Sequence, residues 1–260
     1  MLEMPNRISF EKPPVVETLL EVEFAAVPGW GVQYLGLFWA DIRDRFPRFE
    51  QQPAVLAPSP IVQFNIMSMP IRGWFIDPTD TRVVQVQHDR FSYNWRERPS
   101  HDRYPKYEIL QPEFQREWET FQRFLSRAGL PIPRITVARV VYVNHIPHGQ
   151  GWETARDLGK IIRLWDEERV PSRLQDIQFA SLSTACTLAS GNTVRFDVNP
   201  GLRAVDNVNV VQLTVTVSRR FRDGLSDVIP WFDQAQSELV RSFVDFTTED
   251  IQSRVWLRKS

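Results

Sequence analysis

Mostly apolar residues alternate with Glu17, Leu19, Glu21 and Glu23 in the stretch "PPVVETLLEVEF", residues 13–24, and this pattern limits the fold more than any other feature of the chain. Successive side chains of a β-strand point to opposite faces, so the alternation predicts a strand with one buried face. The residues on that face are Val16, Thr18, Leu20, Val22 and Phe24. A strand of this kind needs a sheet around it and a layer that covers one side of the sheet.

The first half of the chain, residues 1–130, continues in the order β-α-ββββ-α. Apolar residues spaced by three and four predict a helix that ends before Pro47: Val32, Leu35, Trp39, Ile42 and Phe46. Four short runs then predict an antiparallel meander: "IVQFNIM" (61–67), "IRGWFID" (71–77), "TRVVQVQ" (81–87) and "FSYNWR" (91–96). A second helix, which Gly129 and two prolines end, carries Phe114, Trp118, Phe121 and Leu125.

The second half, residues 131–260, repeats this order as β-α-βββ-α. Its predicted elements are a strand over 134–146, a helix over 152–168 through Ala155, Leu158, Ile162 and Trp165, and strands over 174–189, 192–199 and 208–221. A closing helix carries Val228, Phe232, Ala235, Leu239 and Phe246, and Thr247 or Thr248 caps a short terminal helix through Trp256. The order of elements, rather than residue identity, suggests a duplication.

These elements predict an α+β protein of two pseudo-repeats, packed as one compact unit. Each repeat reads β-α-β-meander-α, and together they form a curved antiparallel sheet with helices on one face. This arrangement resembles the fold of the TATA-box-binding protein. The likeness concerns the fold and does not transfer a function.

The tripeptide His88-Asp89-Arg90 looks like a catalytic histidine–aspartate pair but is better explained as a turn. Val84 and Val86 fall on one alternation phase, whereas Phe91 falls on the other, so the pattern slips by one residue at this point. A turn repairs the slip. Aspartate suits a tight turn because its side chain bonds nearby backbone amides. We therefore expect a hairpin here.

Several motifs together resemble a sporadically distributed family of bacterial proteins of about this length. They are "PPVVETLLEVEF", "LGLFWADIRDRFP", "QVQHDRFSYNWR" and the following "YPKYE", so the likeness covers nearly the whole chain. The most specific part is an aspartate-arginine-phenylalanine turn followed by asparagine-tryptophan-arginine: Asp89, Arg90, Phe91, Asn94, Trp95 and Arg96. The molecular function of the family is not established. Its patchy distribution implies a mobile-element, defence or toxin-linked operon.

Composition restricts the cellular setting and the classes of partner. The 260 residues carry a formal net charge of −1, which gives no general attraction to nucleic acid or to a membrane surface. Cys186 is the only cysteine, so the chain forms no internal disulfide and no cysteine-based zinc cluster. Its phase with Leu182 and Leu188 predicts burial as a small apolar group. We expect a cytoplasmic protein without a membrane segment.

Motifs that carry catalysis are missing from the sequence. It has no GxxxxGK[ST], GxGxxG, GxSxG or HExxH, so we assign no catalytic residue and no cofactor. His145 and His148 have a spacing that suits a metal only on a helix, and Pro147 lies between them at a predicted strand end. We predict no metal site. The charged residues of 152–168 are interpreted as the solvated face of a helix.

The side of the sheet away from the helices is the remaining candidate for a binding surface. It should present Glu17, Glu21, Glu23, Ser92, Asn94, Arg96, Arg195, Asp197, Gln212, Thr214 and Thr216. An antiparallel sheet is often simply wetted on one side, and the alternative is a platform for a partner. On the second interpretation Arg90, Asn94 and Arg96 are the candidate partner-binding residues.

The sequence thus favours a non-catalytic module that binds another protein. Binding of nucleic acid through the open face of the sheet is the alternative, and Glu17, Glu21 and Glu23 argue against it because they repel phosphate. An unrecognised enzyme is the third interpretation. The identity of the partner and the oligomeric state stay open.

Overall fold

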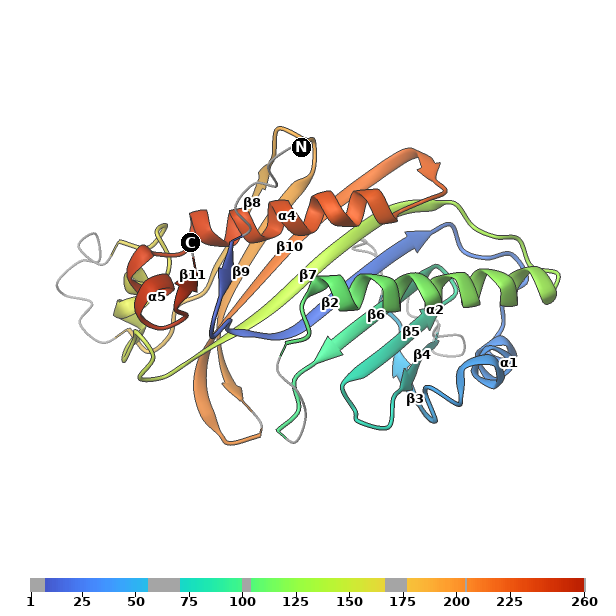
Figure 1. Ribbon diagram of the computed structural model, residues 1–260, viewed down its shortest axis with the longest axis horizontal. Helices are drawn as coiled ribbons and strands as arrows, with labels where there is room; N and C mark the ends of the chain where they lie inside the picture. Colours follow the sequence, from blue (N-terminus) through green and yellow to red (C-terminus); the bar gives the residue numbers. More distant parts are fainter. Residues whose placement is uncertain (1–7, 56–70, 100–103, 167–176, 204, 260) are drawn as a thin grey trace. The chain divides into compact units, whose positions relative to one another are not determined.

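The computed structural model describes residues 8–55, 71–99, 104–166, 177–203 and 205–259. In this part of the chain, five α-helices accompany one large antiparallel sheet, so the protein belongs to the mixed α+β class (Figure 1). Hydrogen-bonded neighbours in the nine-stranded sheet follow the order β3-β4-β5-β6-β2-β7-β10-β9-β8. The predicted strand "IVQFNIM" lies outside the described residues.

Two compact units make up the chain. Unit 1 comprises Met1–Glu17, Val140–Ser218 and Asp233–Ser260, and unit 2 comprises Thr18–Arg139 and Arg219–Phe232. The strands β2 (Val15–Phe24), β7 (Ile135–Pro147) and β10 (Val208–Leu225) supply residues to both. Unit 2 also contains α1 (Gln33–Ile42), β3 (Arg48–Pro53), β4 (Ile71–Ile76), β5 (Arg82–Gln87), β6 (Arg90–Arg96) and α2 (Tyr107–Arg127).

The core of unit 2 forms between helix α2 and one face of its strands, and Figure 1 shows α2 running across them. Phe91, on strand β6, has its ring centroid 5.8 Å from that of Phe114 and 5.3 Å from that of Trp118, which both lie on α2. Trp95 on the same strand is buried, and its ring centroid lies 5.6 Å from that of Tyr104. The contacts of Phe91 confirm the second predicted helix and the inward face of β6, because edge-on and tilted aromatic pairs stabilise a core.

The hairpin at His88-Asp89 is confirmed, and its side-chain bonding differs from the expectation. Gln87 pairs with Arg90, so the turn has two residues. The Asp89 carboxylate accepts a hydrogen bond of 2.7 Å from the Gln87 side chain rather than from a backbone amide. The carbonyl oxygens of His88 and Asp89 accept from the backbone amides of Val27 and Phe24, which fixes the turn to the end of β2.

The first predicted helix exists, but its buried stripe and its length differ. Leu35, Phe38 and Ile42 are buried in α1, whereas Val32 is 61% exposed. Trp39 is only partly buried, and its indole donates to the carbonyl of Phe46 at 2.8 Å. The polar strand β3, "RFEQQP", was not predicted because its largely exposed residues show no apolar alternation.

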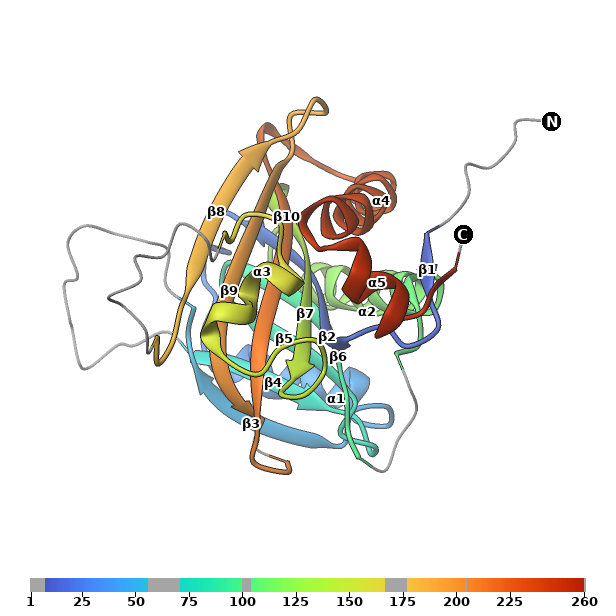
Figure 2. The ribbon, with the colours of Figure 1, turned by 90° about the vertical axis from the view of Figure 1, so that its left-hand side faces the viewer.

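Unit 1 builds its core from the other long strands and the closing helix. Its further elements are β1 (Ser9–Phe10), η2 (Ala155–Asp157), α3 (Leu158–Ile161), β8 (Leu182–Thr187), β9 (Thr193–Arg203), α4 (Ile229–Phe246, from Asp233 on), α5 (Glu249–Arg254) and β11 (Arg258–Lys259) (Figure 2). Phe196 stacks on Phe246 with ring centroids 4.0 Å apart, and Ala235 and Leu239 are buried. The closing helix is therefore confirmed, as is the cap of α5 by Thr248.

Three predictions for unit 1 were wrong in whole or in part. The helix over 152–168 is reduced to η2 and α3, because Ile162 is extended and forms a β-bridge with Thr247 that ends the helix. Cys186 is exposed rather than buried, because β8 lies at the edge of the sheet. The strand predicted over 174–189 shortens to β8, and its first three residues lie outside the described part of the chain.

Candidate functional site

Unit 2 has a polar face on the side of its strands that points away from α2. Trp74 pairs with Gln85, and Gln85 pairs with Ser92, so polar side chains form rows across neighbouring strands. We define the polar face as Glu21, Glu23, Arg72, Trp74, Gln85, Gln87, Arg90, Ser92, Asn94, Arg96 and Arg139. Much of it is buried: the exposed fractions are 6% for Glu21, 8% for Arg90, 1% for Ser92 and 4% for Asn94. A wetted sheet surface would not show such values.

Arg90 belongs to a buried ion-pair cluster. Its guanidinium donates to Glu21 at 2.8 Å and also to Glu23, and Arg139 donates to both carboxylates at 2.7 Å. The hydroxyl of Ser92 adds a hydrogen bond of 3.1 Å to Glu21. Burial acts to lower the pKa of Arg139, but the hydrogen bond and the charges of Glu23 and Glu21 outweigh it and raise that pKa. These two carboxylates are therefore neutralised within the protein.

Asn94 lies in a second polar contact, between β5 and β6. Its side-chain oxygen accepts a hydrogen bond of 2.7 Å from the Gln85 amide, and both groups are buried. A buried amide pair of this kind avoids the cost of an unbonded polar group. Asn94 thus has a structural role on the polar face, whatever else it contacts.

Arg96 takes part in a cluster of three guanidiniums around one carboxylate, which we call the Asp80 cluster. Arg96 donates to Asp80 at 2.8 Å, Arg98 donates at 2.5 Å, and Arg48 also contacts the same side chain. Burial acts to raise the pKa of Asp80, but the hydrogen bond from Arg98 and the charge of Arg96 outweigh it and lower that pKa. One negative charge faces three positive ones, so the cluster carries an excess of positive charge.

Three N–H groups of the polar face are buried and lack a hydrogen-bond partner in the described structure: Arg72 Nε, Trp74 Nε1 and Arg90 Nε. The Arg72 guanidinium lies 5.4 Å from the Trp74 ring centroid, and that of Arg96 lies 5.5 Å from it. Burial lowers the pKa of Arg72, Glu21 raises it and Arg90 lowers it, with a net decrease. Buried polar groups in native proteins are nearly always hydrogen-bonded, and here all three are donors. They suit an acceptor such as a carboxylate.

Part of this site is predictable from the sequence. The predicted residues Arg90, Asn94 and Arg96 lie on one strand, with Arg90 and Arg96 in separate ion-pair clusters. Arg72, Trp74 and Asp80 were not predicted. The available signal was the alternation of "IRGWFI", in which arginine and tryptophan flank Gly73 in the same phase.

The histidines that the sequence analysis considered for metal binding have other contacts. The His145 ring lies 3.3 Å from the Gln212 side chain, and His148 lies 3.0 Å from the Glu153 carboxylate. Within the described residues, no group of three or more histidine, cysteine, aspartate or glutamate side chains has the geometry to hold a metal ion.

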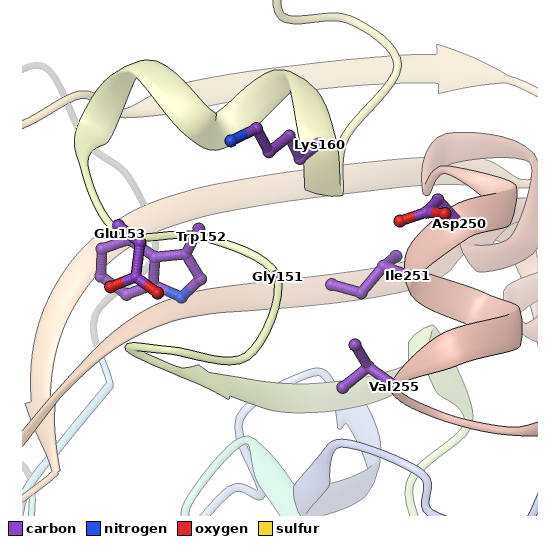
Figure 3. Close-up of a pocket in the computed structure, with 7 residues that line it drawn as sticks. All are labelled: Gly151, Trp152, Glu153, Lys160, Asp250, Ile251 and Val255. Carbon is purple, nitrogen blue, oxygen red and sulfur yellow. The ribbon is translucent and has the colours of Figure 1, made fainter.

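Unit 1 contains a small pocket of about 260 Å³ between α3 and α5 (Figure 3). It is lined by Gly151, Trp152, Glu153, Lys160, Asp250, Ile251 and Val255. Lys160 is paired with Asp157 at 2.6 Å, and Asp250 is paired with Arg254 at 2.8 Å. Its charged groups therefore already have partners, which makes the polar face of unit 2 the stronger candidate.

No protein-family model matches the sequence, and no curated protein is similar enough to count as a relative. Among the helices that the structure describes, none is both long and apolar enough to cross a membrane. The geometry of the polar face therefore carries the functional argument.

Proposed function

We propose that this protein is a binding module that recognises an acidic segment of another protein through the polar face of unit 2. The observation that carries the proposal is the set of buried donors at Arg72, Trp74 and Arg90, which have no acceptor among the described residues. A carboxylate from a partner supplies the missing acceptor. Hydrogen bonds between arginine and a carboxylate are among the strongest in proteins, because both groups are charged.

Charge on the polar face supports an acidic partner. Glu21 and Glu23 are already paired with Arg90 and Arg139, so they do not neutralise further cations. The Asp80 cluster adds an excess of positive charge at the end of the same strand, where Arg96 lies over the Trp74 ring. Arginine and tryptophan, together with tyrosine, are enriched among the residues that contribute most to the binding energy of protein interfaces.

Nucleic acid is the second candidate, and the contact of Arg72 and Arg96 with the Trp74 ring favours it. Aromatic rings beside arginines bind single-stranded nucleic acid by stacking on its bases. We prefer a protein segment, because Glu50, which pairs with Trp74 across β3 and β4, repels the unbroken row of charges on a phosphate chain, whereas a peptide can place a neutral residue at that point. A short acidic peptide needs fewer favourable positions than a nucleic-acid backbone.

We also propose that the chain is duplicated, in an arrangement like that of the TATA-box-binding protein. Its support is the element order, in which β2-α1-β3-β4-β5-β6-α2 is followed by β7-α3-β8-β9-β10-α4. In the sheet, β6 lies beside β2 and β10 lies beside β7, so each first strand pairs with the last strand of its own meander. The operon setting that the family resemblance implies makes products of neighbouring genes the first partners to examine.

Fluorescence anisotropy with two labelled probes tests the proposal: an oligoglutamate peptide and a single-stranded DNA oligonucleotide. We expect the wild-type protein to bind the peptide, and Arg72→Ala and Arg96→Ala to weaken that binding about tenfold each. Arg195→Ala is the matched control, because Arg195 is an exposed arginine on β9 that is paired with Asp197. Tighter binding of DNA than of the peptide would replace the proposal with the nucleic-acid alternative, and binding of neither probe would reject both.

A further inference from the structure

Strand β8 is an exposed edge strand of the sheet in unit 1. It is the last strand in the sheet order, and Figure 2 shows it outside β9. Four of its six residues are exposed and the other two are half-buried. In the described structure, β9 is the only strand that pairs with it. An edge of this kind presents a row of free backbone donors and acceptors to another strand.

The hydrogen-bond pattern shows which backbone groups point outward. The amide of Leu188 donates to the carbonyl of Asn192 at 2.8 Å, just beyond the end of β8. Hydrogen-bonded and non-hydrogen-bonded residue pairs alternate along an antiparallel ladder. Counting back from Leu188 in steps of two, the backbone groups of Cys186 and Thr184 are therefore hydrogen-bonded to β9. The N–H and C=O groups of the intervening residues, Ser183, Ala185 and Thr187, therefore point away from β9.

Strand β8 lacks the residues that usually prevent pairing between edges. The opposite edge strand, β3, carries Arg48, Glu50 and Pro53. By contrast, β8 reads "LSTACT", with no charged residue and no proline. Natural proteins protect exposed edges with charges, prolines or bulges, because an unprotected edge pairs with other strands. Edge β3 is protected in this way and edge β8 is not.

We propose that β8 pairs with β8 of a second copy of this chain, antiparallel and about a two-fold axis at Ala185. This register uses all three outward-facing residues of each copy, because Ser183 then pairs with Thr187 of the other copy. Hydroxyl side chains that face each other across two strands form a favourable pair. The register also keeps the helix-covered sides of both sheets on the same side. The inference is independent of the proposed binding function.

Charge and size fit a second copy as the partner. A neutral strand meets its own copy without bringing like charges together, and Arg195, which pairs with Ala185 on β9, is already neutralised by Asp197 at 2.7 Å. Pairing of one six-residue strand buries less than about 1,000 Å² in total, the lower range for specific interfaces. We therefore expect weak, concentration-dependent self-association.

Sedimentation equilibrium and cross-linking through Cys186 test the pairing. In the proposed register Cys186 lies diagonal to its copy, at a Cα separation of about 7–8 Å. That is too long for an unstrained disulfide but suits a short bis-maleimide. Because the chain has one cysteine, every such cross-link joins two molecules. We expect the wild-type protein to dimerise as its concentration rises and to give a cross-linked dimer.

Three substitutions of Ala185 distinguish self-association through β8 from self-association through any other surface. Ala185→Pro removes an outward N–H, and Ala185→Glu places two like charges at the axis, so both should abolish the dimer and the cross-link. Ala185→Ser keeps the edge and should dimerise as the wild type does. Thermal melting of each variant shows that it is folded. A wild-type protein that stays monomeric at all concentrations, or a folded Ala185→Glu variant that still dimerises, would overturn the proposal.

Discussion

The two units carry polar sheet faces that arise from the same alternation but differ in burial and bonding. In unit 2, Glu21, Ser92 and Asn94 are buried in networks of ion pairs and hydrogen bonds. In unit 1, Arg195 is exposed, and its partner among the described residues is Asp197, two residues away on its own strand. Alternation determines which way a side chain points. Whether that direction leads to solvent or to a site depends on tertiary structure.

This difference separates stability from binding on the polar face of unit 2. Glu21, Glu23, Arg90 and Arg139 neutralise one another, which gives them a structural role, and Arg90 in addition supplies its Nε donor to the proposed recognition site. The donors of Arg72 and Trp74 have no such role among the described residues. Substitutions in the first group should therefore act on folding, and substitutions in the second group should act on recognition.

The largest expected effect comes from Arg90→Ala. It leaves the buried carboxylate of Glu21 and the half-buried carboxylate of Glu23 with Arg139 as their remaining cation, and removal of one partner from a buried ion pair costs about 3–5 kcal/mol of the free energy of unfolding. Arg195→Ala is the counterpart in unit 1 and should leave the urea midpoint unchanged. Equal urea midpoints for Arg90→Ala and Arg195→Ala would show that the two faces contribute equally to stability, which contradicts the prediction.

Asn94→Ala should have the next largest effect. It leaves the Gln85 amide without its bond to Asn94, and an unsatisfied buried polar group costs about 1–3 kcal/mol. Thr216→Ala, on the corresponding face of unit 1, should change the free energy of unfolding by less than about 0.5 kcal/mol, as is usual away from buried networks. Urea denaturation of both variants measures the difference. A small loss for Asn94→Ala would mean that the Gln85 contact is dispensable.

Local patterns predicted the direction of side chains well and their burial less well. The alternation in β2 and β6 and the helical spacing in α2 and α4 identified the buried faces correctly, because a strand or helix that packs on a core needs one apolar side. Cys186 shows where a local pattern fails to predict burial. Its phase is that of a core residue, yet β8 is an edge strand, and position in the sheet is not visible in the strand's own sequence.

The predicted site residues show the same limit. Arg90, Asn94 and Arg96 were selected because they alternate with the core residues of β6, which correctly gave their direction. Their partners are distant in sequence: Arg90 contacts Glu21, which is 69 residues away, so no local pattern could show the pairing. The helix over 152–168 failed for a related reason, since its end is set by a bridge between Ile162 and Thr247.

Acid should weaken both units, and unit 2 more, through the Asp80 cluster at the end of its polar face. The pKa of Asp80 is lowered because the hydrogen bond from Arg98 and the charge of Arg96 outweigh burial, and that of Asp197 is lowered chiefly by its hydrogen bond from Arg195. A carboxylate with a lowered pKa stabilises the fold above its ordinary pKa, and this stabilisation disappears as the pH falls through the lowered value. Asp80→Asn should therefore reduce the stability lost on acidification below about pH 4.

The matched variant for this pH test is Asp197→Asn, which should reduce the loss less, because a single arginine holds Asp197 whereas three contact Asp80. Urea midpoints of the wild-type protein and both variants, measured from neutral pH down to about pH 3, give the comparison. An unchanged acid dependence in Asp80→Asn would show that the Asp80 cluster contributes little to folding.

The smallest expected effect is the coupling between Arg195 and Asp197. Their side chains form two hydrogen bonds, of 2.7 and 2.8 Å, on the exposed face of β9. Exposed ion pairs contribute little because water solvates the separated charges almost as well and salt screens their attraction. Arg195→Ala, Asp197→Ala and the double variant should therefore have urea midpoints that add without coupling, in low and in high salt. The same double-mutant cycle for Arg90 and Glu21 should show strong coupling that salt barely changes, because those groups are buried.

A measurable, salt-resistant coupling for the β9 pair would contradict this prediction. It would mean that the polar side chains of unit 1 are coupled as strongly as those of unit 2, and it would remove the reason for assigning recognition to unit 2 alone.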